Sequence, residues 1–411
     1  MQTCKIVISI MSVLVALVPF LNDYAMPGLG VNVGLCVLVM FVALAFIKRP
    51  FYLKHNLIAR DVILYVLLIY LFICSFAAFV RGDCDLSVLG NVLFTYIVLL
   101  PAVQRLNFID KELMMKTIEV MAIIGGIVIC FQYLFFYVFG FNDLWFWIPF
   151  DSWTYTYANN SAKSALVNGV LFRPSGIFTE PSHYSVYASI ALAYRLFHSE
   201  KIADIAGIFI TITTILSTSG MGIVFVMFIW AYYLVVCDVS KQSKVILLCS
   251  AVIVATLAFA YLYRFEFFRF TLERVFFTNG RFENAYAGRT FTSYILDDLN
   301  LTQRWFGMGY RNEPTQLNSL GEPVGLFMVA IVELQFCIGY IGTALFLALC
   351  VYLMIKAREF NRLVMIIYIM NVFIAAVVNL TSLFFYAAVV SELFLDGKYE
   401  SNHQKSTDIT I

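Results

Sequence analysis

Long, almost uncharged apolar stretches recur along this chain. Crossing the roughly 30 Å hydrocarbon core of a membrane takes a helix of about 17–25 such residues. The sequence predicts about twelve spanning helices, at 6–22, 29–47, 61–80, 87–104, 117–139, 181–198, 202–217, 220–236, 245–263, 337–355, 362–378 and 379–395. The alternating pattern of outer-membrane strands is absent. We therefore expect an all-α polytopic membrane protein in which residues 1–411 form a single transmembrane domain.

Composition excludes the soluble alternatives. Hydrophobic residues make up 62% of the chain and charged residues 13%, against about 45–50% and about 25% in soluble domains. A soluble fold of this composition would expose large apolar patches to water. The net charge of +1 also gives no electrostatic reason to expect a nucleic acid as partner.

Lysine marks one side of the predicted membrane domain. With the N-terminus inside, eleven of the twelve lysines fall in inner loops or tails, and the exception is Lys163. Cytoplasmic loops carry such an excess of basic residues. The sequence therefore predicts that both termini, including the tail at 396–411, are cytoplasmic.

Two long loops, at 140–180 and 264–321, face outside in this topology; we call them the first and second outer loops. Loops of this length in a compact protein are usually functional, and we expect short amphipathic helices within them. The small inner loops contain no phosphate-binding motif of the Gly-Lys-Ser type. We therefore expect chemistry at the outer face, driven by energy already stored in the substrate.

The second outer loop is rich in arginine. It holds seven arginines, six acids and no lysine. We expect most of these arginines to pair with the neighbouring acids. One or two are candidates for binding phosphate, because a guanidinium group offers phosphate oxygens a bidentate fork that lysine cannot match.

The first outer loop is rich in aromatic residues. Those at 141–150 are typical of an interfacial aromatic belt or a re-entrant helix. Trp153 could instead stack on sugar rings, with Lys163 nearby as a hydrogen-bond donor.

This loop ends in a run from Arg173 to Tyr184 that leads directly into an apolar helix. Thr179 is expected to cap that helix, with Pro181 in its first turn. Capping does not explain Arg173 or His183. A base, Glu180 or His183, beside the Arg173 cation is what a group-transfer site needs, since one removes a proton and the other holds an anionic leaving group.

Taken together, these elements resemble the O-antigen polymerase family, within the superfamily shared with the O-antigen ligases. The matching elements are Arg173-x-x-Gly176-x-Phe178-x-Glu180-Pro181-Ser182, Ser217-Thr218-Ser219-Gly220, Gly288-Arg289-Thr290, Phe306-Gly307-Met308-Gly309-Tyr310, and Glu333 with Gly339 and Gly342. Their order and spacing cover roughly residues 110–395.

The resemblance implies a reaction at the outer face of the bacterial inner membrane. Such polymerases transfer a growing glycan from undecaprenyl diphosphate to the non-reducing end of a new lipid-linked repeat unit, without metal, nucleotide or other cofactor. The implied catalytic residues are Arg173, Glu180 and Arg289, and the implied substrate-binding residues are Arg281, Arg311 and Tyr310. His183, the alternative catalytic base, and the substrate-binding candidates Lys163 and Trp153 come from this sequence and not from the resemblance. Implied partners are the lipid-linked substrates, membrane lipids, a chain-length regulator and a flippase.

Three alternatives remain. A ligase of the same superfamily uses a histidine in its second large outer loop, and this chain has none between 264 and 321. A different polyprenyl-phosphate-dependent glycosyltransferase would use an acidic pair, for which Asp83 and Asp85 are candidates, although acids in a short turn beside Arg81 are ordinary surface residues. A flippase or other transporter would need charged residues within its spans, and these spans are nearly free of charge.

Overall fold

The computed structural model describes residues 2–26, 32–48, 59–139, 151–152, 174–199, 204–237, 242, 245, 263–264, 295–310, 330–374 and 380–391. The chain divides into two compact units. Unit 1 comprises residues 1–18, 35–114 and 288–411, and unit 2 comprises residues 19–34 and 115–287.

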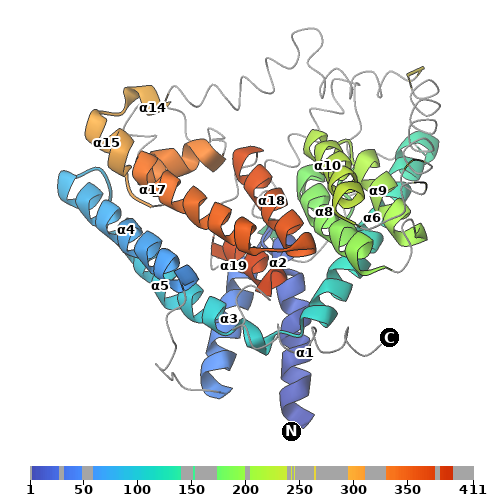
Figure 1. Cartoon of the computed structure of the whole chain (residues 1–411), viewed down its shortest axis with the longest axis horizontal. Helices are drawn as coiled ribbons and strands as arrows, with labels where there is room; N and C mark the ends of the chain where they lie inside the picture. The colour runs from blue at the N-terminus through green and yellow to red at the C-terminus, as the bar shows by residue number, and fades with distance from the viewer. Residues whose placement is uncertain are drawn as a thin grey trace. The chain divides into compact units, whose positions relative to one another are not determined.

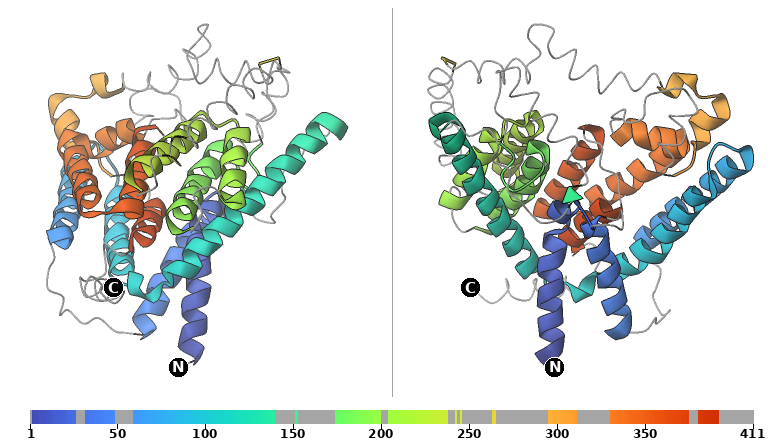
Figure 2. Two further views of the ribbon diagram at one scale, coloured as in Figure 1. Left: turned by 45° about the vertical axis from the view of Figure 1, so that its right-hand side comes forward. Right: turned by 180° about the vertical axis from the view of Figure 1, so that it is seen from behind.

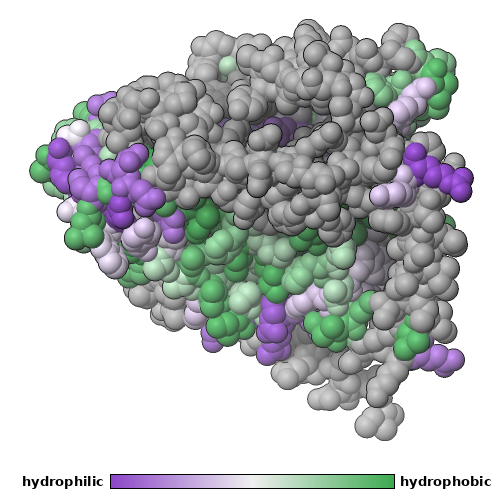
Figure 3. Space-filling view, turned by 90° about the horizontal axis from the view of Figure 1, so that it is seen from above, coloured by the Kyte–Doolittle hydropathy of each residue, from purple (hydrophilic) through white to green (hydrophobic). Residues whose placement is uncertain are grey.

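Unit 1 is built from helices (Figure 1). They are α1 (Gln2–Ala16), α3 (Val33–Lys48), α4 (Ala59–Arg81), α5 (Leu86–Gln104), η1 (Leu106–Phe108), α14 (Ile295–Asp298), α15 (Leu301–Phe306), α17 (Ala330–Lys356), α18 (Glu359–Ile374) and α19 (Leu380–Val389). Helices α4 and α5 form a hairpin, and α17 packs against α4, α15 and α18. Hydrophilic side chains gather at one edge, over the end of unit 1 that carries α14 and α15 (Figure 3).

Unit 2 has helix α8 at its centre. Its elements are α2 (Val18–Leu21), β1 (Tyr24–Ala25), most of α6 (Lys111–Phe139), β2 (Asp151–Ser152), α8 (Pro181–His198), α9 (Ile205–Leu216) and α10 (Gly220–Val236). The two short strands pair antiparallel. Helices α8, α9 and α10 lie side by side (Figures 1 and 2). Small residues let α8 pack closely on both neighbours, and its buried Ser185 and Ser189 donate to carbonyls of their own helix.

The described helices overlap eleven of the twelve predicted spans. The remaining range, 245–263, lies outside the described residues except for its two ends. Within the described part of the chain, three helices are long and apolar enough to cross a membrane: Leu86–Gln104, Lys111–Phe139 and Ile331–Lys356. The protein is thus mostly helical with candidate membrane spans, and the count of twelve stays a prediction.

Helix α6 shows why the chain suits a lipid environment. An apolar stripe of spacing four, three, four and three is exposed along it, formed by Val120, Ile124, Ile127, Phe131 and Leu134. The other face is buried, with Ile118, Ala122 and Ile129 at 0% exposure. A continuous exposed apolar stripe is unusual on a soluble monomer, so we infer that this face meets lipid.

Helix α17 differs from its predicted span at 337–355. It begins at Ala330, and its backbone leaves the helical region at Gly339, where φ is +67° and ψ is −177°. The span predicted from hydropathy begins at residue 337, seven residues after the helix itself begins. Hydropathy also gave no sign of the break at Gly339, because a change of backbone conformation does not alter hydrophobicity.

Candidate functional site

The structure describes three of the nine predicted site residues. Glu180 and His183 lie in unit 2, and Tyr310 lies in unit 1. The other six, Arg173, Arg289, Arg281, Arg311, Lys163 and Trp153, lie outside the described residues.

The segment after Arg173 is a buried turn fixed to helix α6. Gly176 has φ of +66°, and a Cβ on it would lie 2.6 Å from the carbonyl oxygen of Gly125. The Gln132 side chain hydrogen-bonds both backbone groups of Gly176, donating to its oxygen at 3.1 Å and accepting from its nitrogen at 2.9 Å. A glycine at position 176 is therefore required by close backbone contact as well as by its conformation.

Aromatic packing fixes the start of α8. The Phe178 ring packs on the rings of Tyr184 and Tyr187, with centroids 5.9 and 5.2 Å away. The Tyr184 hydroxyl donates to the Ala122 carbonyl at 3.2 Å and hydrogen-bonds Thr213 at 2.8 Å. These contacts hold the residues just before and after Glu180 against α6 and α9.

A buried carboxylate joins the end of the turn to the first turn of α8. Asp23 Oδ2 accepts from Thr179 Oγ1 at 2.7 Å and lies 2.9 Å from His183 Nδ1. The side chain of Asp23 is 8% exposed and that of His183 is 30% exposed. Because an ionised carboxylate only accepts, Nδ1 carries the proton, and Nε2 has no hydrogen-bond partner within the described part of the chain.

Tyr24 and the Glu180–Ser182 pair lie next to these contacts in the sequence. Burial and the Asp23 carboxylate raise the pKa of Tyr24 to about 12, so its phenol stays protonated and donates a long hydrogen bond to the Ile177 carbonyl at 3.5 Å. Glu180 accepts from Ser182 Oγ at 3.0 Å. Asp23 thus bonds Thr179 and His183, and Ser182 bonds Glu180, at the start of α8; we call these five residues the α8 cluster.

The prediction that Thr179 caps α8 is wrong. The N-cap residue is Glu180, and it makes no side-chain capping hydrogen bond. Pro181 occupies the first turn, as predicted. Thr179 lies one residue before the N-cap, and its hydroxyl donates to the buried Asp23 carboxylate.

The Ser217-Thr218-Ser219-Gly220 turn supports the same helix. Ser217 Oγ lies 3.0 Å from Ser185 Oγ, and Ser219 caps α10. A Cβ on Gly222 would lie 2.5 Å from Ser185 Oγ. This turn therefore packs against α8 two residues beyond His183.

In unit 1, Phe306–Tyr310 packs on the break in α17. The amides of Met308 and Gly309 donate to the carbonyls of Phe336 and Cys337, both at 2.9 Å. Tyr70 donates to the Ile338 carbonyl at 2.8 Å. The carbonyls released by the break at Gly339 are thus satisfied by the Phe306–Tyr310 segment and by α4, as buried carbonyls require.

The Tyr310 side chain is buried, and its amide donates to Ser75 Oγ at 3.1 Å. Its role in substrate binding stays a prediction.

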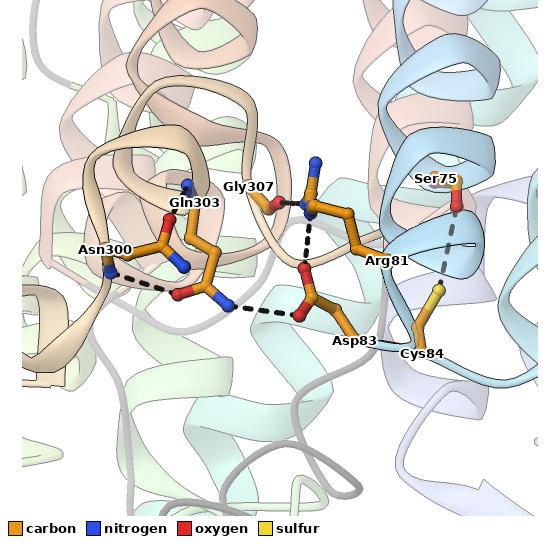
Figure 4. A network of polar contacts seen from close by, with 7 residues as sticks. All are labelled: Ser75, Arg81, Asp83, Cys84, Asn300, Gln303 and Gly307. Atoms are coloured by element: carbon orange, nitrogen blue, oxygen red, sulfur yellow. Dashed lines mark hydrogen bonds and ion pairs between the residues drawn. The ribbon is translucent and has the colours of Figure 1, made fainter.

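Asp83 belongs to a structural network at the end of α4 (Figure 4). Arg81 donates to Asp83 at 2.6 Å and to the Gly307 carbonyl at 2.9 Å. Gln303 donates to the other Asp83 oxygen at 3.1 Å. Both oxygens of Asp83 are therefore used to hold the segment containing α15 against the α4–α5 turn.

Cys84 lies beside this network and is chemically quiet. Burial and the neighbouring Asp83 and Asp85 raise the pKa of its thiol to about 11, so the reactive thiolate is scarce near neutral pH. Its sulfur donates to the Ser75 carbonyl at 3.6 Å. Across the described ranges, no three His, Cys, Asp or Glu side chains group as metal ligands would, and the metal-free reaction stays a prediction.

Sequence reasoning missed Asp23 and Gln132. Asp23 had a visible signal, because it is the only charged residue between Lys5 and Lys48, and a lone acid between apolar segments needs a partner. Gln132 had no such signal within its apolar helix.

Comparison with protein-family models, curated proteins and solved structures gives no match.

Proposed function

We propose that this protein polymerises lipid-linked glycan repeat units at the outer face of the bacterial plasma membrane. It transfers a growing glycan from undecaprenyl diphosphate to the non-reducing end of a new undecaprenyl-diphosphate-linked unit. The observation that carries the proposal is the α8 cluster. There Glu180, which bonds Ser182, and the Asp23–His183 pair lie within the first turn of one helix, directly after the turn that follows Arg173.

The reaction exchanges one bond at the anomeric carbon. An acceptor hydroxyl of the new unit forms a bond to that carbon, the bond from the carbon to the diphosphate breaks, and undecaprenyl diphosphate leaves. Glu180 takes the hydroxyl proton through the carboxylate oxygen that Ser182 does not bond.

His183 contacts a substrate oxygen through Nε2. Asp23 keeps the proton on Nδ1 and holds the ring in place.

Positive charge from the outer loops stabilises the leaving group. Arg173 and Arg289 hold the diphosphate, with Arg281 and Arg311 assisting, because guanidinium pairs bidentately with phosphate. Tyr310, Lys163 and Trp153 bind the glycans. The partners in the cell are a flippase that delivers repeat units and a chain-length regulator. In this proposal no cofactor takes part.

The structure also bears on the acidic-pair alternative. An acidic-pair glycosyltransferase would need Asp83 free for a metal or a substrate, whereas both of its oxygens are engaged by Arg81 and Gln303. Transfer that is abolished by a chelator would nevertheless favour that enzyme over the polymerase.

Deletion of the gene tests the proposal directly. Cells without the protein should carry a single repeat unit on the final acceptor, and plasmid-borne wild-type protein should restore long polymer. Full-length polymer retained on the lipid carrier would instead identify a ligase. Single units accumulating inside the cell would identify a flippase. Gel electrophoresis of surface and lipid-linked glycans separates these outcomes.

A further inference from the structure

Helix α15 turns its two most polar side chains toward the protein. Gln303 Nε2 donates to Asp83 Oδ1 at 3.1 Å, and Gln303 Oε1 accepts from the Asn300 amide at 3.0 Å (Figure 4). The Arg304 guanidinium group donates to two backbone carbonyls just before the helix. The polar side of α15 is therefore bound by other parts of unit 1.

The opposite side of α15 is apolar and exposed. Leu301, Trp305 and Phe306 are 72%, 47% and 43% exposed. At 3.6 residues per turn these three side chains lie on one side of the helix, and Gln303 and Arg304 lie on the other. An amphipathic helix on a water-facing surface has the reverse arrangement, with its apolar side toward the protein. The outward side of α15 therefore suits an apolar partner.

This apolar side is continuous with the exposed face of a candidate membrane span. The Trp305 ring meets the Tyr340 ring edge-on, with centroids 5.8 Å apart and planes at 89°. Tyr340 is the first residue of an exposed stripe along α17, which continues through Ala344, Ala348, Val351 and Ile355. Because Ile331–Lys356 is long and apolar enough to cross a membrane, the partner along this stripe is lipid, and Trp305 extends the stripe onto α15.

The position of Trp305 along the span corresponds to a membrane boundary. Lys356, at the other end of α17, lies sixteen residues beyond Tyr340, which is about 24 Å along a helix and most of the roughly 30 Å hydrocarbon core. Tryptophan and tyrosine are enriched where the acyl chains meet the headgroups. With Lys356 on the predicted inner side, Trp305 and Tyr340 are expected at the outer boundary.

We propose that α15 is an interfacial helix whose Leu301, Trp305 and Phe306 insert among the phospholipids of the outer leaflet. Such helices bury their apolar side about 5–10 Å deep at the boundary between headgroups and acyl chains. Gln303 fixes α15 to the end of α4, and the Phe306–Tyr310 segment follows directly. The inserted helix therefore sets the depth of that segment at the membrane surface. This contact with lipid does not depend on the proposed glycan transfer.

Fluorescence quenching in lipid vesicles tests the inference. The full-length protein, with its other four tryptophans replaced by phenylalanine, is reconstituted in phosphatidylcholine that carries bromine either near the glycerol or near the chain end. Iodide in the buffer is the aqueous quencher. Trp305 should lose most emission with bromine near the glycerol, less with bromine near the chain end, and least with iodide.

A tryptophan placed in the middle of a span is the matched control. Ile97 lies near the middle of α5 and is 67% exposed. In the same protein with Trp305→Phe, Ile97→Trp should reverse the order of the two brominated lipids, because its ring meets the interior of the bilayer. The pair of variants thus reports depth on one scale.

Each other quenching pattern overturns the inference. Strongest quenching by iodide would place Trp305 in water, and strongest quenching from the chain end would place it deep in the bilayer. Quenching by none of the reagents would mean that a second copy or another protein covers this side of α15.

Photolabelling of the wild-type protein decides the question if the variants fail to fold. A phosphatidylcholine with a diazirine near the glycerol should label Leu301, Trp305 or Phe306 and leave Gln303 and Arg304 unlabelled, as mass spectrometry of the fragments would show. A wild-type protein without label on α15 would contradict insertion of this helix.

Discussion

Asp23 joins Thr179 and His183 at the start of α8. Its single oxygen Oδ2 contacts both Thr179 and His183, which are more than 150 residues away along the chain. Without it, His183 would be a lone histidine in the first turn of a helix. With it, Nδ1 has a buried carboxylate as its partner and the ring has a fixed orientation, which general acid–base chemistry requires.

At this scale we predict that Asp23→Asn and His183→Gln slow polymer formation. Acid–base groups contribute about 10²–10⁴-fold to rate, and both variants should lose within that range while the protein still inserts. The measurement is the initial rate with purified protein and lipid-linked repeat units. His198→Gln, at the exposed end of α8, is the control. A wild-type rate from Asp23→Asn would limit Asp23 to a structural role.

Glu180→Gln separates two functions of one residue. Loss of polymer would fit a proton acceptor, because an amide cannot take the proton. Retained activity would instead mean that Glu180 only positions the turn through its contact with Ser182. We expect a loss within the same range as for His183→Gln, assayed in the same way.

Arg173→Ala and Arg289→Ala should each abolish polymer and leave the protein in the membrane. Removing one partner of a desolvated charge pair costs about 2–5 kcal/mol, and lysine should not rescue fully where the contact is bidentate. Arg304→Ala is a matched control, since its guanidinium group bonds the Leu299 and Asp297 carbonyls of its own segment. Near-normal polymer from both test variants would remove these arginines from the site.

At the scale of elements, two glycines explain how α17 and the Phe306–Tyr310 segment meet. A Cβ on Gly307 would lie 2.3 Å from the Cys337 carbonyl oxygen, and one on Gly339 would lie 2.3 Å from that of Trp305. Both glycines have positive φ. The backbones around Gly307 and Gly339, which are some thirty residues apart in the sequence, are thus in direct contact with each other.

We therefore expect Gly307→Ala and Gly339→Ala to destabilise the protein. Positive φ alone costs a non-glycine residue about 1–3 kcal/mol, and steric overlap with backbone adds to that. Thermal unfolding in detergent should show a clearly lower midpoint for both. Gly82→Ala, with positive φ and open space, should show a smaller loss, and Gly90→Ala, in open space on α5, should show none. Equal midpoints for Gly339→Ala and Gly90→Ala would contradict this packing.

At the scale of the whole molecule, the described helices support membrane association, and the charge pattern predicts which side of the membrane each loop faces. The helices supply length and apolar surface, as α6 shows. The distribution of lysines predicts the orientation. Reporter fusions test that orientation: green fluorescent protein at the C-terminus should fluoresce, and alkaline phosphatase fused at Lys163 should be active. An active phosphatase at the C-terminus would reverse the topology.

The sequence predicted helix positions well because hydrophobic length is a local property. The ranges of α5 and α10 match their predicted spans to within a residue. It also made Glu180 and His183 candidates, because polar residues at the start of an apolar helix are conspicuous, and their catalytic role stays a prediction. It misjudged Thr179 and missed Gln132, because each depends on a partner that is distant in sequence.

By itself, the sequence predicted a helical chain with apolar segments that could span a membrane, with lysine on the inner side and arginine concentrated in the two predicted outer loops. Those properties follow from the cost of burying charge in lipid, which acts on each segment separately. The tertiary structure decided that Asp23 meets His183, that Gln132 holds Gly176, and that α17 breaks where another glycine crosses it. These depend on hydrogen bonds and close contacts between segments far apart in the chain, which no local pattern encodes.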